Sequence, residues 1–324
     1  MTIVVKINAQ MTKPDIHLRF CVDENADKKR LDSVLSRKIE GFSRSQVQNW
    51  IVSDYVKIDE KICNKAKQLL KKGQIVQIDA PLPKHTEDVA QKQDLDIIHE
   101  DEHILIIFKP SGWVVHPGAG NRDGTLMNAL LYHCPDATQL PRAGIVHRLD
   151  KDTSGIMMVA KTPLAYQSLT QELAARNVHR HYYAIVDGTL KRSQTIHTHM
   201  GRHPISRIKM AVVNQGKEAI THVKIAQFLQ GYTLIEATLD TGRTHQIRVH
   251  MQHIGHPILG DKTYGKHKAF RLLPPTLSIQ VQAMPRQALH AYKLTLPHPQ
   301  THKEMTFTCP IPPDMQSLVD ALSS

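Results

Sequence analysis

Apolar residues near the start of the chain follow two different periods. Positions three and four apart predict one helix over residues 31–39 and a second that begins at Ser43, where Ser-Arg-Ser-Gln has capping-box spacing. Residues 55–58 and 74–78 instead alternate between apolar and polar side chains, which predicts two strands. We expect a small α/β unit whose core lies within residues 15–80. The apolar positions of its helices are Leu31, Val34, Leu35, Ile39, Val47, Trp50 and Ile51.

A break in the pattern follows this unit. Residues 81–83, Pro-Leu-Pro, and the polar residues after them show no periodicity, which is typical of a linker. A length of 324 residues also suits two domains. We therefore expect a small domain at 1–84, a linker at 85–95 and a large domain at 96–324.

The large domain mixes strand-like and helix-like patterns. Residues 164–173 follow Pro163 with helical spacing, and this predicts a helix in which Leu164, Leu169 and Leu173 share a face. Helices and strands that do not alternate strictly favour an α+β fold over a doubly wound sheet. The stretches that predict strands are 104–108, 156–160, 183–186 and 233–239.

The charge of the chain favours a polyanionic partner. Lysine and arginine number 41 against 30 acidic residues, a net charge of +11, and the pI is about 9.4. No run of 18 apolar residues predicts a membrane span, and residues 1–6 do not have the pattern of a signal peptide. The scattered cysteines are typical of reduced thiols, so we expect a cytoplasmic protein. They are Cys21, Cys63, Cys134 and Cys309.

The most informative stretch is residues 147–155, His-Arg-Leu-Asp-Lys-Asp-Thr-Ser-Gly. It places the acid Asp150 between two cations, Arg148 and Lys151, just before the apolar strand predicted at 156–160. Nearby positive charge keeps a carboxylate ionised, and a rigidly held carboxylate can serve as a nucleophile or stabilise a cation. The alternative is a surface charge cluster at the start of a strand.

This stretch resembles the signature of the RluA-type pseudouridine synthases. Three further stretches resemble the family's other motifs in the same order, and the resemblance runs from about Asp96 to near the C-terminus. Four ordered motifs are far more specific than one short pattern. The resemblance implies an α+β pseudouridine synthase fold with a curved, mostly antiparallel sheet and a central cleft. The motifs lie at residues 147–155, 180–184, 241–250 and 286–291.

The resemblance also implies roles for individual residues. Asp150 matches the catalytic aspartate, and Tyr182 matches a tyrosine that packs on the uracil and could help to move the C5 proton. We expect Arg248 to pair with Asp150, with Arg243 as the competing partner. Phosphate binding by Arg248 and simple core packing by Tyr182 are the alternatives. The expected substrate-binding residues are His147, Arg148, Arg243, His245 and Gln246, and Arg148 matches an arginine thought to fill the stack vacated by the flipped base.

The expected reaction needs few groups. Conversion of uridine to pseudouridine breaks the N1–C1′ bond and joins C5 to C1′, and it conserves atoms and oxidation level. It therefore requires no cofactor, and the sequence has no nucleotide-binding glycine motif. A carboxylate below C1′ would stabilise the oxocarbenium-like sugar. The sequence leaves open whether Asp150 attacks C1′ or removes a proton from C2′.

The small domain resembles an RNA-binding module that also occurs in a ribosomal small-subunit protein. Its expected RNA contacts are Arg44, Lys57 and Lys61. The module usually has Asn-Gly in a turn where this chain has Asp59-Glu60, so we expect a looser hairpin. The alternative is a charged domain without a ligand.

Stretches before the main motif, residues 114–121 and 141–146, look most like the RluD branch, which modifies the helix 69 stem-loop of 23S ribosomal RNA. We expect a monomer that acts on large-subunit ribosomal RNA or a pre-ribosomal particle. The alternatives are another ribosomal or transfer RNA site, a catalytically silent RNA-binding or ribosome-assembly protein, and a glycoside hydrolase that uses Asp150 and Asp152.

Histidines at short spacing suggest a metal site only weakly. Structural zinc sites combine four ligands in paired spacings, and no cysteine lies near these histidines. We therefore expect no metal, and imidazoles that contact phosphate or sugar. The histidines are His197, His199, His250, His253 and His256.

Overall fold

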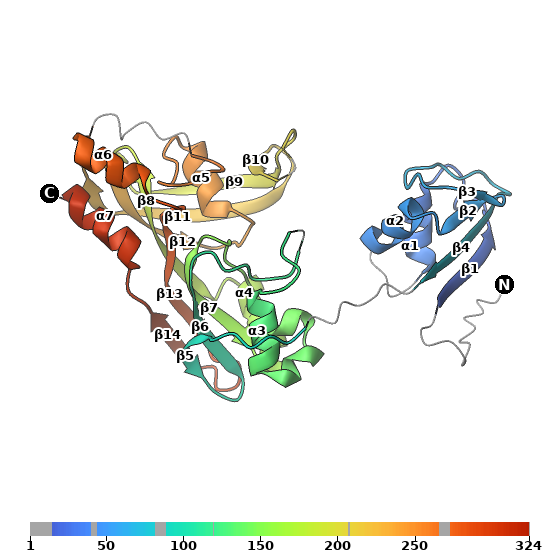
Figure 1. Ribbon diagram of the computed structural model, residues 1–324, viewed down its shortest axis with the longest axis horizontal. Helices are drawn as coiled ribbons and strands as arrows, with labels where there is room; N and C mark the ends of the chain where they lie inside the picture. The colour runs from blue at the N-terminus through green and yellow to red at the C-terminus, as the bar shows by residue number, and fades with distance from the viewer. Residues whose placement is uncertain are drawn as a thin grey trace. The chain divides into compact units, whose positions relative to one another are not determined.

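The chain divides into two separately packed units, Met1–Glu87 and Asp88–Ser324 (Figure 1). The computed structural model describes residues 15–39, 44–81, 89–118, 120–206, 208–265 and 273–323. Ser43, the predicted start of the second helix, and residues 82–88, which include part of the predicted linker, lie outside the described residues.

The small unit packs two helices on one face of a four-stranded antiparallel sheet (Figure 1). Every apolar position predicted for the two helices is buried in the core of this unit. The predicted face of each helix is thus confirmed, because helical spacing places those side chains together over the sheet. The elements are β1 (Asp15–Cys21), α1 (Leu31–Lys38), α2 (Arg44–Val52), β2 (Val56–Ile58), β3 (Lys61–Ile62) and β4 (Ile75–Pro81), in the strand order β1-β4-β2-β3.

The hairpin between β2 and β3 is closed, so the expectation of a looser turn was wrong. Asp59 and Glu60 have φ angles of 49° and 63°, as a two-residue hairpin turn requires. The Asp59 carboxylate accepts hydrogen bonds from the Ile75 amide at 2.8 Å and from Gln74 Nε2 at 3.1 Å. These bonds tie the turn to β4 and hold a conformation that is otherwise unfavourable without glycine.

We expect Glu60→Gly to stabilise the small unit by about 0.5–1 kcal/mol. Glycine removes a left-handed penalty of roughly 1–2 kcal/mol, and greater freedom of the unfolded chain offsets part of this gain. Urea unfolding of residues 1–84, followed by Trp50 fluorescence, measures the change. Asp59→Gly is the matched control and should destabilise, because it also removes the bonds to β4. A loss of stability in Glu60→Gly would contradict the left-handed conformation of Glu60 in this turn.

The large unit is built on one mixed sheet of ten strands (Figure 1). Within the described residues, neighbouring strands of this sheet are antiparallel except β7 and β13, which are parallel. The strand order is β10-β9-β11-β12-β8-β13-β7-β6-β5, and β14 pairs with β13. The strands are β5 (Asp96–Glu100), β6 (Ile104–Lys109), β7 (Ser154–Ala160), β8 (His179–Asp187), β9 (Gln194–Arg202), β10 (Met210–Val212), β11 (Lys217–Leu229), β12 (Tyr232–Leu239), β13 (Leu289–Pro297) and β14 (Glu304–Thr308).

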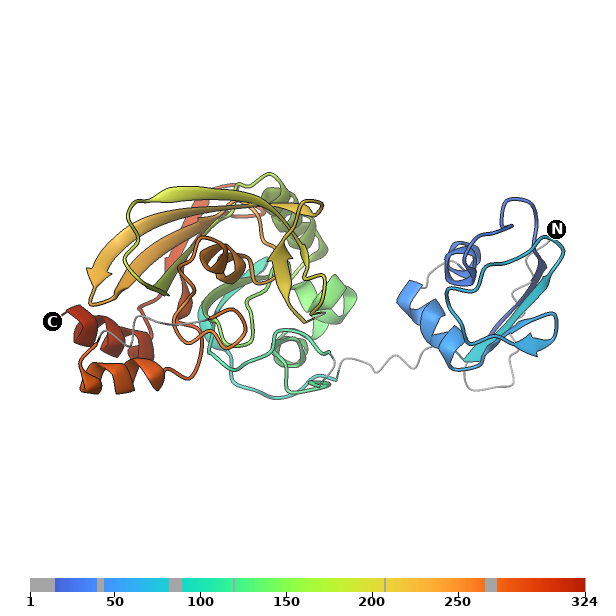
Figure 2. The same cartoon turned by 90° about the horizontal axis from the view of Figure 1, so that it is seen from above.

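The sheet of the large unit curves around α5, which is the helix seen end-on beneath the yellow strands in Figure 2. Apolar side chains from the strands of this sheet are buried in two separate hydrophobic clusters. Every residue of β7 is buried. All four predicted strand stretches lie in strands, so the pattern is confirmed for β6, β7, β8 and β12. The helices are α3 (Leu126–His133), α4 (Pro163–Ala174), α5 (Gln246–His253), α6 (Pro275–Gln282) and α7 (Pro313–Ser323), with 3₁₀ turns at Pro135–Gln139 and Pro141–Gly144.

Helix α4 forms where it was predicted, but its buried face is different. Thr162 caps the helix by accepting a hydrogen bond from the Ala165 amide, and Pro163 occupies the first turn. Ala165 and Leu169 are fully buried, whereas Leu164 is 52% exposed. The prediction that Leu164 shares a face with Leu169 was wrong, because residues five apart lie about 140° apart around a helix, whereas Ala165 and Leu169 are four apart and share the buried face. Among the described residues, no helix is long and apolar enough to span a membrane.

Candidate active site

A cleft of about 570 Å³ lies in the large unit, bordered by the loop before β7, by β8 and by the start of α5. This volume lies in the range of pockets that bind small molecules. The cleft brings together all the residues of this unit that the sequence singled out. They are His147, Arg148, Asp150, Tyr182, Arg243, His245, Gln246 and Arg248.

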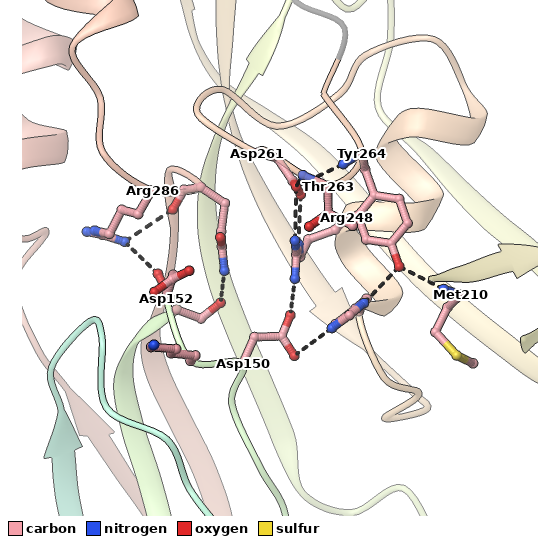
Figure 3. A network of polar contacts seen from close by, with 12 residues as sticks. Asp150, Asp152, Met210, Arg248, Asp261, Thr263, Tyr264 and Arg286 are labelled. Carbon is pink, nitrogen blue, oxygen red and sulfur yellow. Dashed lines mark hydrogen bonds and ion pairs between the residues drawn. The ribbon is translucent and has the colours of Figure 1, made fainter. Parts of the chain in front are cut away.

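An ion-pair chain runs from the cleft into the protein (Figure 3). Arg248 Nη1 donates to Asp150 Oδ2 at 2.9 Å. On its other side, Arg248 donates through Nε and Nη2 to both carboxylate oxygens of Asp261, at 2.7 and 2.9 Å. A planar guanidinium held by two bonds to one carboxylate has little freedom to rotate. Arg248, and not Arg243, therefore orients Asp150.

Asp261 is set up to hold this arginine. Its Oδ1 also accepts the amides of Thr263 at 2.8 Å and Tyr264 at 3.0 Å. Burial acts to raise the pKa of Asp261, but the hydrogen bonds and charge of Arg248 outweigh it and lower the pKa below the usual value. Asp261 therefore stays ionised near neutral pH.

His245 lies on the other side of Asp150, with its Nε2 at 3.9 Å from Asp150 Oδ1. Its Nδ1 is 2.7 Å from the Tyr264 hydroxyl, which accepts a hydrogen bond from the Met210 amide (Figure 3). Burial lowers the pKa of His245, although Asp150 acts to raise it. The imidazole is thus neutral near neutral pH, and Arg248 supplies the positive charge that faces Asp150.

The loop that carries Asp150 is held by a buried lysine. Lys109 Nζ donates to the carbonyls of Pro110, Trp113 and Lys151 at 2.7, 3.0 and 2.9 Å. Burial lowers the pKa of Lys109 to about 7, and Asp152 and Asp150 act against this change. The three hydrogen bonds of Lys109 join the turn after β6 to Lys151, which follows Asp150.

Gly155 lets β7 and β13 approach closely just after the same loop. A Cβ at Gly155 would lie 2.2 Å from the Ala291 carbonyl oxygen, and its φ is +127°. No other residue fits both this space and this backbone conformation. The Gly at the end of the first motif is thus explained by the parallel pairing of Ala291 with Gly155.

Two predicted residues point unpartnered polar groups into the cleft. Tyr182 is 5% exposed, and burial raises its pKa, so the phenol stays protonated near neutral pH. Its hydroxyl has no hydrogen-bond partner among the described residues. Arg148 is exposed, and no ion pair joins it to that part of the chain. The sequence suggested that Arg148 and Lys151 hold the charge of Asp150, but the ion pair comes from Arg248 instead.

Three other predicted residues make hydrogen bonds within the protein, although His147 Nδ1 is buried without a partner among the described residues. The Gln246 amide accepts from Thr241 Oγ1 and the Arg243 amide, and donates to Ile220 O and Thr221 Oγ1. These bonds hold the start of α5 against β11. Arg243 Nε donates to the Glu218 carbonyl. His147 Nε2 accepts the Met158 amide at 3.0 Å, which fixes the motif loop to β7. Their contact with substrate stays a prediction.

The predicted RNA contacts of the small unit differ in their surroundings. Arg44 donates to the fully buried Asp32 at 2.9 Å, while half of its side chain remains exposed. Lys61 is exposed and Lys57 is half-buried on the β2–β3 hairpin. Arg44 therefore also stabilises the fold of the unit, and the contact of all three residues with RNA stays a prediction.

The histidine pattern does not form a metal site in the described part of the chain. His250 Nδ1 lies 2.8 Å from Thr221 Oγ1, and its Nε2 lies 2.9 Å from Thr198 Oγ1. Where potential ligands do cluster, at Glu100, His133 and Cys134, the Glu100 carboxylate is already paired with Lys161 at 2.7 Å.

Comparison with known proteins decides the family. The model of the RNA pseudouridylate synthase family matches residues 103–253. Ribosomal large subunit pseudouridine synthase D of Pseudomonas aeruginosa is 45% identical over 296 residues, which cover 90% of this chain and 92% of that protein. The protein of the same name in Escherichia coli is 43% identical over 312 residues, 95% of this chain and 94% of that one. The chain belongs to the RluA family of RNA pseudouridine synthases.

This pseudouridine synthase also has the predicted RNA-binding module, because an S4 domain model matches residues 29–76. A solved structure, human RNA Pseudouridylate Synthase Domain Containing 1, has 25% sequence identity and a TM-score of 0.53, and covers 75% of this chain and 91% of that chain. The predicted family, the isomerase activity and the α+β fold are confirmed.

Sequence reasoning missed three residues of the site. They are Asp261, Tyr264 and Lys109, and all act through other side chains or the backbone. The signal for the first two was a short run, Gly-Asp-Lys-Thr-Tyr-Gly at 260–265, in which a lone acid sits in a glycine-flanked turn. Lys109 gave no signal, because a lysine at a strand end usually stays in solvent.

Proposed function

We propose that this pseudouridine synthase isomerises uridines in large-subunit ribosomal RNA, at the helix 69 stem-loop of the 23S molecule. Two relatives named ribosomal large subunit pseudouridine synthase D match almost the whole chain, which supports this substrate class. The net charge of +11 and the S4 domain support an RNA partner. The observation that carries the catalytic role is the Asp150 carboxylate, held at 2.9 Å by Arg248 in the cleft.

In the proposed reaction, Asp150 faces C1′ of the flipped nucleotide and stabilises the positive charge that develops as uracil leaves. Arg248 holds the carboxylate in its orientation, and Asp261 keeps Arg248 in place. Tyr182 packs on the face of the uracil, and its protonated hydroxyl lies free to exchange a proton near C5. Arg148 fills the stack that the uracil vacates, because a guanidinium stacks well on bases.

Pseudouridine mapping of ribosomal RNA with and without this protein tests the substrate. We expect pseudouridines in the helix 69 stem-loop that depend on the protein. Dependent sites elsewhere in ribosomal or transfer RNA would assign it another substrate. RNA binding without tritium release from C5-labelled uridine would make it a silent RNA-binding protein, and free uracil as product would indicate a glycoside hydrolase.

We expect Arg148→Ala to slow the reaction far more on a structured stem-loop than on an unpaired oligonucleotide. If Arg148 fills the vacated stack, it offsets an unstacking cost of a few kcal/mol that an unpaired strand does not carry. Single-turnover rates at saturating enzyme on both RNAs measure the difference. Equal losses on the two RNAs would rule out stack filling and return Arg148 to a purely electrostatic role.

Deletion of residues 1–84 should weaken RNA binding and flatten its salt dependence while leaving activity on a minimal stem-loop. The small unit has its own core, separate from that of the large unit, so the catalytic unit keeps its packing. Fewer cations then displace fewer counterions, and the slope of log K against log salt falls. An unchanged slope would mean that the small unit does not touch this RNA.

A further inference from the structure

Arg180 on β8 is a buried arginine without a counter-charge. It is 8% exposed, and within the described residues its side chain has no hydrogen bond or ion pair, its buried Nε included. Two other arginines are equally buried, and each faces a carboxylate. Arg248 pairs with Asp261, and Arg286 pairs with Asp314. A buried cation without a counter-charge destabilises the fold, and this points to a ligand that supplies negative charge.

The side chain of Arg180 lies in the cleft beside the proposed uracil position. Arg180 precedes Tyr182 by two residues on the same strand, so both side chains leave the same face of β8, about 7 Å apart. The charge of Arg180 also acts against the effect of burial on the pKa of Tyr182. A group bound by Arg180 would therefore belong to the nucleotide whose base packs on Tyr182.

Gly242 leaves room for this arginine on the opposite wall. A Cβ at Gly242 would lie 2.7 Å from Arg180 Nη1, and Gly242 does not have a left-handed φ. A larger residue at position 242 would therefore displace the guanidinium of Arg180 from its present position. The loop of Gly242, between β12 and α5, also borders the cleft, which places the guanidinium tip between two walls of the site.

Arg180 needs a negatively charged partner, and this need indicates which part of the RNA it binds. A uridine base is neutral before reaction, whereas each phosphodiester carries a full negative charge, which a guanidinium binds through parallel hydrogen bonds. We propose that Arg180 binds a backbone phosphate next to the target uridine and so positions the flipped nucleotide over Asp150. This inference rests on the proposed RNA substrate. Arg180 opens the second motif, residues 180–184, but the sequence assigned a role only to Tyr182 within that motif.

Arg180→Gln, Arg180→Lys and the matched control Arg286→Gln test the proposal. Binding of the helix 69 stem-loop is measured against salt in the Asp150→Asn background, together with the melting temperature of each variant. Arg180→Gln should bind about tenfold to one-hundredfold more weakly at low salt. Its slope of log K against log salt should fall by about 0.7–0.9, the loss of one phosphate contact. Arg180→Lys should keep that slope.

Stability separates this role from a structural one. Arg180→Gln removes a buried charge that has no partner, so its melting temperature should be unchanged or higher. Arg286→Gln should have a lower melting temperature, because it leaves Asp314 without its ion-pair partner. An unchanged salt slope in Arg180→Gln would overturn the proposal. If the same substitution with Asp150 intact then slowed the reaction without lowering the melting temperature, Arg180 would act on the departing uracil instead. A lower melting temperature with an unchanged slope would overturn the proposal in favour of packing.

The proposed RNA substrate is tested separately, by turnover of the wild type. If the wild type leaves the helix 69 stem-loop unmodified, the substrate is wrong, and the binding comparison uses the RNA that pseudouridine mapping identifies. The salt slope of Arg180→Gln on that RNA then decides the role of Arg180 by the same criterion.

Discussion

Asp150→Asn should abolish isomerisation while RNA binding survives. The amide keeps the shape of the carboxylate and can still meet Arg248, but it lacks the negative charge that stabilises the sugar cation. Removal of one such electrostatic group typically costs 100- to 1,000-fold in rate, and loss of a group that reacts directly costs more. We therefore expect at least a roughly 1,000-fold lower rate, measured by tritium release from C5-labelled RNA in single turnover.

The control for this variant is binding of the same RNA. Affinity should change little, because the cleft keeps its arginines and the small unit is untouched. Appreciable turnover by a pure Asn variant, checked by mass spectrometry for deamidation, would remove Asp150 from its role. A parallel loss of binding would mean that Asp150 shapes the cleft more than it serves the reaction.

Asp261→Asn should lower both stability and rate, although Asp261 does not line the cleft. The substitution leaves Arg248 without the carboxylate that grips its Nε and Nη2, and breaking such a buried pair costs about 3–5 kcal/mol. A freed guanidinium no longer aims Asp150, and small misplacement of a reacting group can cost about 100-fold in rate. Chemical unfolding and single-turnover rates measure the two effects.

A carboxylate away from the cleft provides the matched control. Asp101 accepts the His103 and Ile104 amides at the β5–β6 turn, so Asp101→Asn should lose stability but keep its rate. If Asp261→Asn kept the wild-type rate, Asp261 would not be needed to orient Arg248 toward Asp150. Rescue of the rate by Asp261→Glu would favour positioning over simple packing.

The pH dependence of stability gives an independent check on Asp261. Its pKa is lower in the folded protein than in the unfolded chain, so its stabilisation is fully present above the unfolded value near 4. The stabilisation is then lost as the pH falls through the lower folded pKa. The wild type should therefore lose stability more steeply than Asp261→Asn below about pH 4. Parallel curves would mean that Asp261 is not ionised in the fold.

The sequence predicted the elements that depend on local pattern. Helix α1 and strand β7 follow from apolar spacing, which states the period of a segment and its apolar face. Leu164 and Leu169 are five residues apart, which is about 140° around the helix, and Leu164 is accordingly exposed while Leu169 is buried. The β2–β3 turn closed because Asp59 is stabilised by Gln74 and Ile75, which local pattern does not connect to it.

The sequence by itself determined the family and the basic, two-unit organisation, and it singled out Asp150 as the proposed catalytic residue, because ordered motifs and composition are properties of the chain. Only the tertiary structure decided how the charges combine. Asp150 has cations at adjacent positions, yet it pairs with Arg248, 98 residues away, because the curved sheet brings the start of α5 to the motif loop. Likewise, Arg248 forms an ion pair with Asp261, whereas Arg180 forms no ion pair within the described residues. Pairing depends on distance and burial in the folded molecule, and neither is a property of sequence spacing.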